Sequence, residues 1–275
     1  QQIDPKHGRL VNWNNKSARG FEAADDAWNY GSIHRVDLLN ALLDKHKEKY
    51  DLASVTAAMN AAATQDLRSV RITPSLEEVL QTGPAPTDRA AQMLALLQRW
   101  NREGSSRLDR DLDGTIDAPG AAIMDVAWPL LANAVLRPVL GDLVGAEAGE
   151  PGGPSGLAGI VGRYALPPAG QSTGWQSYVD KDLRTLLGDQ VAAPFRNRYC
   201  GGGDLTACRI ALWDALDAAG AELEAAQGPD PEAWRSDATR ERIAFVPGLL
   251  PTTMRYTNRP SGIQQLISFD GHRRR

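Results

Sequence analysis

The distribution of helical and β patterns along the chain most constrains its fold. Apolar residues recur at helical spacing through the middle of the chain, in stretches that start near Ser32, Asp51, Thr87, Ala121, Trp175 and Leu205. The runs that most favour β-strands occur near the ends, at residues 9–12, 243–246 and 263–269. Three strands are too few to form an independent sheet against so large a helical layer. We therefore expect an α+β chain, largely helical, whose strands near both ends join a sheet completed by another chain.

Two stretches carry weaker patterns. Residues 67–72 alternate between apolar and polar side chains before Pro74, which predicts a strand or an extended connection. Residues 141–170 contain nine glycines and four prolines. We interpret this stretch as a surface loop rather than a domain boundary, because the composition on its two sides is the same. Residues 1–275 are expected to form one domain, completed by companion chains.

Charge and hydropathy exclude some classes of protein. The formal net charge is −4 and the pI is about 5.6, whereas nucleic-acid-binding proteins present a basic face. No uninterrupted apolar stretch reaches the roughly 20 residues that cross a bilayer, so no membrane span is expected. The first residues, Gln1 to Pro5, have neither the basic start nor the apolar core of a signal peptide.

The two cysteines of the chain, Cys200 and Cys208, bracket a run of three glycines. Neither cysteine has the spacing of a zinc site. The glycines allow the chain to turn back, and Asp204 can cap a helix that carries Cys208 in its first turns. A local disulfide is therefore the preferred interpretation, and it would place the protein in an oxidising compartment. Two buried free thiols are the alternative.

Residues 109–117 match the first nine positions of a calcium-binding loop. Acidic residues at alternate positions are followed by Gly114 and, two residues later, by Ile116. The twelfth position departs from the EF-hand pattern, because Gly120 replaces the bidentate Glu and Asp125 is the nearest later carboxylate. We expect a calcium loop of another type, with ligands Asp109, Asp111, Asp113, Thr115 and Asp117. The alternative is an acidic, solvated turn.

A tryptophan among three amides, at residues 12–15, is the strongest candidate for a catalytic segment. An Asn side chain offers neutral N–H donors, which suit a developing oxyanion. Turn-capping amides are the alternative. Arg35 follows in the first turn of a predicted helix, where a cation opposes the helix dipole and indicates an anionic neighbour. The four histidines are scattered and no serine lies in a Gly-x-Ser-x-Gly elbow, so a self-contained triad is not expected.

These landmarks together resemble the penicillin acylase family of N-terminal-nucleophile hydrolases. The resemblance rests on residues 12–15, Asp25 and 31–35, on the cysteine loop that leads into 209–213, and on 258–265. It covers nearly the whole chain and corresponds to the C-terminal portion of the family's β-subunit. It implies a four-layer αββα sandwich and hydrolysis of an acyl-amide bond.

The resemblance also implies roles for individual residues. Asn14 matches the family's oxyanion-hole asparagine, Arg35 matches an arginine near the nucleophile, and Asp25 matches a ligand of a structural calcium ion. The family attacks with an N-terminal Ser, whereas this chain begins with Gln1, which is no nucleophile. We therefore expect the Ser on a companion chain of the same processed precursor, together with an α-subunit, in a secreted or periplasmic enzyme.

Two functional hypotheses follow. The first is an amide acylase that acts on a penicillin, an N-acyl-homoserine lactone or a similar N-acyl compound. The second is a calcium-stabilised helical scaffold or binding module without catalytic activity. Only the first explains the tryptophan-asparagine segment and the strands split between the two ends.

Overall fold

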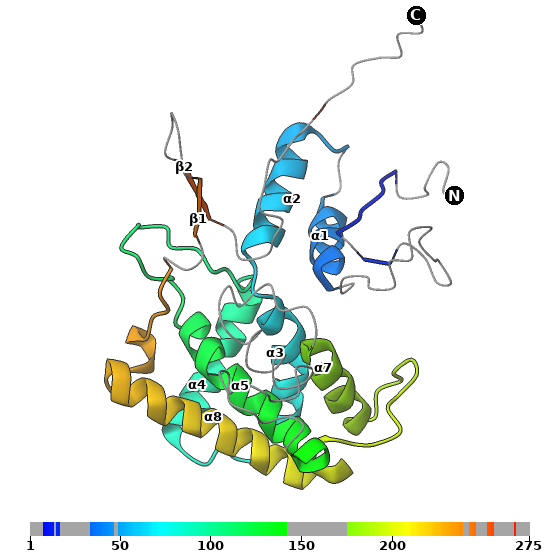
Figure 1. The fold of residues 1–275 in the computed structure, drawn as a ribbon, viewed down its shortest axis with the longest axis vertical. Coiled ribbons are helices and arrows are strands. Elements are labelled where there is room, and N and C mark those ends of the chain that lie inside the picture. The colour runs from blue at the N-terminus through cyan, green and yellow to red at the C-terminus, as the bar shows by residue number, and fades with distance from the viewer. Residues whose placement is uncertain are drawn as a thin grey trace, which may run out of the picture. The chain divides into compact units, whose positions relative to one another are not determined.

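The computed structural model describes residues 8–13, 15–16, 34–46, 49–141, 175–238, 242–245, 252–255 and 267, with backbone alone at 34–35, 175–177, 242–245 and 252–255. Its α-helices are α1 (His34–Lys45), α2 (Leu52–Thr64), α3 (Leu67–Leu80), α4 (Asp88–Arg102), α5 (Pro119–Leu140), α7 (Trp175–Leu186) and α8 (Leu205–Gln227) (Figure 1). Two short 3-10 helices are η3 (Cys200–Gly203) and η4 (Pro231–Ala233). The strands are β1 (Arg242–Phe245) and β2 (Thr252–Arg255).

The chain divides into two compact units. One contains residues 1–63 and 259–275, and the other contains residues 64–258. In the first unit, α1 and α2 confirm the predicted helices. The Asp51 carboxylate caps α2 by accepting a hydrogen bond from the Ser54 amide at 2.7 Å, and the Ser54 hydroxyl accepts one from the Asp51 amide at 3.0 Å.

The strand predicted at residues 9–12 is wrong for this chain, because these residues have no regular secondary structure. Local side-chain hydrogen bonds dominate the end of this segment. The Asn15 side-chain oxygen accepts from the Trp13 amide at 3.0 Å, and the Asn12 amide group donates to the Asn15 carbonyl at 3.5 Å. Asn side chains compete in this way with the ladder hydrogen bonds of a sheet.

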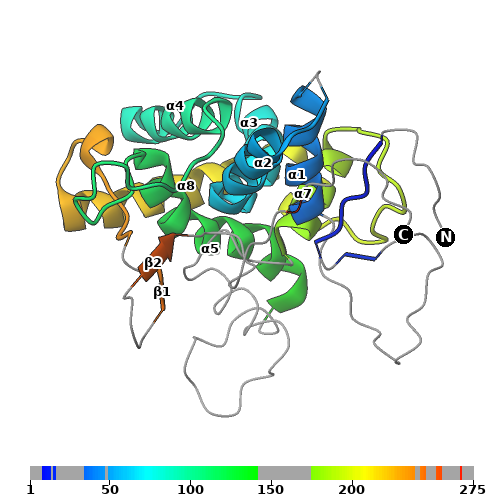
Figure 2. The same ribbon diagram turned by 90° about the horizontal axis from the view of Figure 1, so that it is seen from above.

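The second unit is a helical body built around α5. This helix contacts α8, α4 and α7 (Figure 2), and it also contacts η3. α3 packs against α7 and α4. Trp128, Ile123 and Met124 of α5 are buried in its core. The predicted helices correspond to α4, α5, α7 and α8 and are confirmed. The predicted loop at 141–170 lies outside the described residues beyond Gly141.

Beyond the helical body, the second unit contains a small antiparallel sheet. β1 pairs with β2 in a register that sets Arg242 opposite Arg255 and Phe245 opposite Thr252. β1 confirms the strand predicted at 243–246, whereas β2 was not predicted. The strand predicted at 263–269 lies outside the described residues apart from Ile267, which has no regular structure.

The extended segment predicted at residues 67–72 is wrong, because these residues form the first half of α3. Asp66 caps the helix, and its carboxylate accepts from the Arg68 and Ser69 amides at 2.9 and 3.2 Å. Leu67, Ile72, Leu76, Val79 and Leu80 are then buried at helical spacing. The cap and this buried face outweigh Pro74, which lies within the helix and removes one backbone hydrogen bond.

The expectation that no segment has the length of a membrane span needs a correction. α5 has 22 residues, and an 18-residue window within it has a mean hydropathy of 1.3, so the helix is long and apolar enough to cross a bilayer by length and composition. Its apolar character has another explanation in this fold. Eleven of its residues between Gly120 and Leu136, among them Trp128 and Leu131, are buried in the helical body, where α5 packs against α4 and α8.

Candidate functional site: an acidic loop beside buried ion pairs

The acidic loop between α4 and α5 brings three carboxylates together. Asp109, Asp111 and Asp117 each offer one oxygen, and these oxygens all lie within 4.8 Å of one another. Asp109 is buried and Asp111 is exposed. Gly114 supplies the tight turn with φ of +96°, and its amide donates to Asp109 Oδ2 at 3.3 Å. The loop therefore presents hard oxygen ligands of the kind that calcium prefers.

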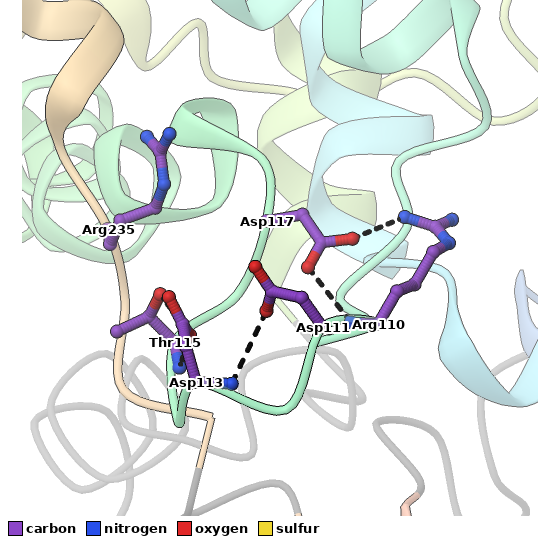
Figure 3. A pocket seen from close by; sticks show the side chains of 6 residues that line it. All are labelled: Arg110, Asp111, Asp113, Thr115, Asp117 and Arg235. Carbon is purple, nitrogen blue, oxygen red and sulfur yellow. Dashed lines mark hydrogen bonds and ion pairs between the residues drawn. The ribbon is translucent and has the colours of Figure 1, made fainter.

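The other two predicted ligands hydrogen-bond to each other. Asp113 Oδ1 accepts from the amide and the hydroxyl of Thr115 at 2.7 and 2.8 Å. Both side chains line the same open pocket of about 270 Å³ as Asp111 and Asp117 (Figure 3).

Two guanidinium groups, from Arg110 and Arg235, complete the lining of this pocket. The Arg110 amide donates to Asp117 Oδ1 at 2.9 Å, and its Nη1 donates to Asp117 Oδ2 at 2.6 Å. A cation in the loop would therefore compete with Arg110 for the Asp117 carboxylate. Because the Arg110 side chain is 62% exposed, its ion pair is of the weak surface kind.

A cluster of buried ion pairs lies at the base of the loop. Arg107 Nη1 and Nη2 donate to Asp125 Oδ1 and Oδ2, each at 2.9 Å, and Nη1 also donates to Asp66 Oδ2 at 3.0 Å. Arg68 Nη2 donates to Asp66 Oδ2 at 2.6 Å and to Asp125 Oδ1 at 2.5 Å. The Arg68, Arg107 and Asp66 side chains are fully buried, and that of Asp125 is 16% exposed. We call these four residues the ion-pair cluster.

The two arginines keep both carboxylates charged. Burial alone would raise the pKa of Asp66 and of Asp125, but the charges of Arg68 and Arg107 hold both pKa values below the ordinary range of an aspartate. Burial likewise opposes the charge of Arg68, and the two carboxylates raise its pKa above the usual value. The cluster has two positive and two negative charges and is formally neutral.

Backbone hydrogen bonds hold the acidic loop against residues 236–238, and this segment also contacts the ion-pair cluster. The Ser236 hydroxyl donates to Asp125 Oδ2 at 2.6 Å. Beside it, the Ile116 amide donates to the Ser236 carbonyl at 2.8 Å, and the Ala238 amide donates to the Gly114 carbonyl at 2.9 Å. Contacts with residues 236–238 therefore add to the hydrogen bonds within the loop in fixing its conformation.

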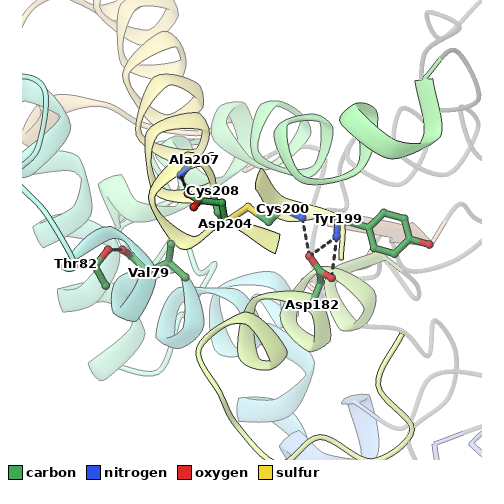
Figure 4. The surroundings of a disulfide bond; sticks show 8 residues. All are labelled: Val79, Thr82, Asp182, Tyr199, Cys200, Asp204, Ala207 and Cys208. Carbon is green, nitrogen blue, oxygen red and sulfur yellow. Dashed lines mark hydrogen bonds between the residues drawn. A yellow bond between two sulfur atoms is a disulfide. The ribbon is translucent and has the colours of Figure 1, made fainter. Parts of the chain in front are cut away.

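The predicted disulfide between Cys200 and Cys208 is confirmed (Figure 4). Gly201, Gly202 and Gly203 all have positive φ, which the reversal between the cysteines requires. Asp204 caps α8 through the Ala207 amide at 2.6 Å. On the other side, the buried Asp182 of α7 accepts from the Cys200 amide at 2.8 Å and from the Tyr199 amide at 3.1 Å.

The structure describes little of the predicted catalytic residues. Asn14 and Asp25 lie outside the described residues. Arg35 is in the first turn of α1, as predicted, but its side chain is not described. The sequence reasoning missed Asp66, Arg68 and Arg107. The available signal was Asp66 directly before Leu67, which is the pattern of a helix N-cap.

Comparisons with known proteins agree with the resemblance found in the sequence. The sequence model of the penicillin amidase family matches residues 1–261. Penicillin G acylase of Escherichia coli is 28% identical over 124 residues, which are 45% of this chain and 14% of that protein. The solved structure of a thermostable penicillin G acylase from Alcaligenes faecalis superposes with a TM-score of 0.56 at 21% identity, over 85% of this chain and 39% of that chain.

The chain thus spans well under two thirds of the length of both relatives. The likeness to the solved structure concerns the fold, and the family match covers nearly all of the sequence. This chain belongs to the penicillin amidase family.

Proposed function

We propose that this chain is part of an amide hydrolase that cleaves the acyl-amide bond of a penicillin, an N-acyl-homoserine lactone or a similar N-acyl compound. The observation that carries the proposal is the family match over residues 1–261. The fold likeness over 85% of the chain supports it.

The nucleophile of this enzyme lies on a companion chain. Its N-terminal Ser, activated by its own α-amine, attacks the amide carbonyl carbon and forms a tetrahedral oxyanion. The Asn14 side chain donates an N–H to that oxygen, and Arg35 orients the asparagine or the terminal amine. Collapse expels the amine and leaves an acyl-enzyme, which water hydrolyses to the acid. Partial coverage of both relatives is consistent with a subunit of a larger enzyme.

Replacing Asn14 tests this assignment. In the assembled enzyme, Asn14→Ala should lower kcat about 100-fold or more, because one oxyanion donor is lost. Asn60→Ala is the control, since it removes an exposed amide from α2, outside the candidate catalytic segment. The assay uses a panel of chromogenic N-acyl p-nitroanilides, and the best substrate is used for all variants. Unchanged turnover in Asn14→Ala would remove the assignment.

Intact mass measurement and N-terminal sequencing of every chain in the purified protein test the companion-chain proposal. A companion that begins with Ser supports it, and a protein that purifies alone favours the scaffold hypothesis. We further propose an extracytoplasmic location. The Cys200–Cys208 disulfide supports this location, because such bonds persist in oxidising compartments.

We also propose that the acidic loop binds a structural calcium ion, as the sequence pattern predicted. Support comes from the close carboxylate oxygens of Asp109, Asp111 and Asp117 and from the turn at Gly114. The ion would balance carboxylates that otherwise repel one another. Asp25 is proposed as a ligand of a second, family-type calcium ion, on the resemblance alone.

Calcium titration of EDTA-treated protein tests the loop. Added Ca²⁺ should raise the midpoint of thermal unfolding, since an ion that binds only the folded state stabilises it. Its binding should also give a measurable heat. Asp111→Asn should abolish both effects. Asp214→Asn, on the exposed side of α8, changes the net charge equally and should abolish neither. An unchanged midpoint and no bound metal in the parent protein would count against the calcium loop.

A further inference from the structure

Arg9 joins three parts of the first unit. Its Nη1 donates to the Tyr50 hydroxyl at 2.6 Å, and its Nη2 forms an ion pair with Asp44 in the last turn of α1. The Tyr50 hydroxyl in turn donates to the Leu43 carbonyl at 3.1 Å. The Tyr50 ring stacks on His46 with centroids 5.4 Å apart. One guanidinium thus ties the segment before Asn12 to the C-terminal end of α1 and to the connection that follows it.

We propose that Arg9, Asp44 and Tyr50 form a positioning clamp, which holds the segment leading to Asn14 against the helix whose first turn carries Arg35. The proposal rests on the proposed function, in which these two residues serve the same reaction centre. α1 runs without interruption from His34 to Lys45. A contact that holds its last turn therefore also restrains the direction of the helix axis at its first turn.

A second anchor follows the clamp along the same segment. Trp13 is only 8% exposed, and its amide donates to Asn15 Oδ1 at 3.0 Å. The segment is therefore held before and after Val11, by a charged contact at Arg9 and by a buried ring at Trp13. Two anchors restrict both the position and the rotation of a short segment, whereas one anchor leaves the rotation free.

The character of the clamp favours positioning over stability. The Arg9 side chain is 16% exposed and that of Asp44 is 62% exposed, and such partly solvated ion pairs contribute little to folding. The planar guanidinium nevertheless binds both partners in one orientation, which a lysine cannot reproduce. The hydrogen bond with Asp44 raises the pKa of Arg9 above its already high usual value, so the guanidinium stays charged.

The clamp predicts a defect in turnover without a matching defect in stability or substrate binding. In the assembled enzyme, Arg9→Gln and Asp44→Asn should each lower kcat about tenfold, since small misplacement of a catalytic group has effects of this order or larger, with KM and thermal midpoint near those of the parent. Tyr50→Phe, which removes only a hydroxyl, should give a smaller loss. The double variant Arg9→Asp with Asp44→Arg, which swaps the two charges, should recover part of the kcat that either single substitution loses.

Lys45→Gln is the control, because it removes an exposed charge next to Asp44 on the same helix. Hydrogen exchange of residues 9–16 gives a readout that does not depend on activity, and it should be faster in Arg9→Gln than in Lys45→Gln. Parent-like kcat in both Arg9→Gln and Asp44→Asn, in an enzyme that Asn14→Ala inactivates, would overturn the clamp alone. If Asn14→Ala keeps full activity, the proposed function fails. In that case hydrogen exchange of residues 9–16 tests the clamp. Faster exchange in Arg9→Gln than in the parent supports it, and unchanged exchange overturns it.

Discussion

At the scale of single residues, the ion-pair cluster contains charges that depend on one another. Arg107 contacts both Asp66 and Asp125, and each carboxylate is also held by Arg68. Removing one member leaves a buried charge without its full compensation, which typically costs about 3–5 kcal/mol of stability. A charge that pairs at the surface has no such penalty.

We therefore expect Arg107→Gln to lower the free energy of unfolding by about 3–5 kcal/mol. Arg99→Gln is the matched control, since its pair with Glu232 has side chains 45% and 47% exposed and should contribute at most about 1 kcal/mol. Urea denaturation of both variants measures the difference. Equal losses in the two variants would contradict the dependence of the buried charges on one another.

At this scale the sequence predicted contacts between residues that are close in the chain, but not contacts between residues that are distant in it. The pairing of Cys200 with Cys208 and the cap at Asp204 were predictable because both partners are near in the chain. Arg107 and Asp66 meet only after α3 and α4 have packed, and no local pattern marks such a contact. The grouping of Asp109 with Asp111 and Asp117, without Asp113, likewise depends on the folded turn.

At the scale of elements, helix–helix contacts are close where a glycine replaces a side chain. A Cβ on Gly120, in the first turn of α5, would lie 2.7 Å from Trp100 Cβ of α4. A Cβ on Gly220 of α8 would lie 2.6 Å from the Met93 sulfur and 2.8 Å from Arg89 Nε. The first obstacle is the Cβ of a buried tryptophan, which moves only with its backbone, whereas the second lies along two unbranched side chains that have several rotatable bonds.

These two glycines give a matched pair of tests. Gly120→Ala should destabilise the protein by about 1–3 kcal/mol through overpacking. Gly220→Ala should change stability much less, because the side chains can move and alanine gains up to about 1 kcal/mol in helix propensity. Thermal or urea unfolding of both variants provides the measurement, and a larger loss at Gly220 would contradict this description of the α4 contacts.

Helices with clear apolar spacing were predictable, and α3 shows why one was not. Residues 69–72 alternate between polar and apolar side chains, and Pro74 follows, so local rules favour an extended chain. The cap at Asp66 and the core contacts of Leu76 and Leu80 decide the outcome instead. The segment at 9–12 shows the opposite case, because a β-favouring run forms a strand only where a neighbouring strand pairs with it.

At the scale of the whole molecule, the buried carboxylates predict how stability changes with pH. The folded-state pKa values of Asp66 and Asp125 lie below the unfolded value of about 3.9. Their contribution is therefore complete above about pH 4 and is lost as the pH falls further toward the folded-state pKa values. Asp180 has the opposite sign, because burial raises its pKa and its charged form costs stability at neutral pH.

Urea denaturation from pH 7 to pH 3 tests both signs. The parent protein should lose stability most steeply below about pH 4. Asp180→Asn should be more stable than the parent at pH 7, and the gain should shrink as the pH falls through the raised pKa of Asp180. Asn keeps an oxygen that can accept the Ser75 hydroxyl bond, which Asp180 Oδ1 accepts at 3.0 Å. A constant difference between the two proteins at every pH would contradict the assignment.

The ion-pair cluster also has an evolutionary consequence. Because the loss of one member is costlier than the joint replacement of all four by apolar residues of similar volume, single substitutions lead through unstable intermediates. Related chains should therefore keep Asp66, Arg68, Arg107 and Asp125 as a set or lack them as a set. The acidic loop beside the cluster is free of this constraint at its exposed positions, so single substitutions can accumulate there while the four cluster residues change only together.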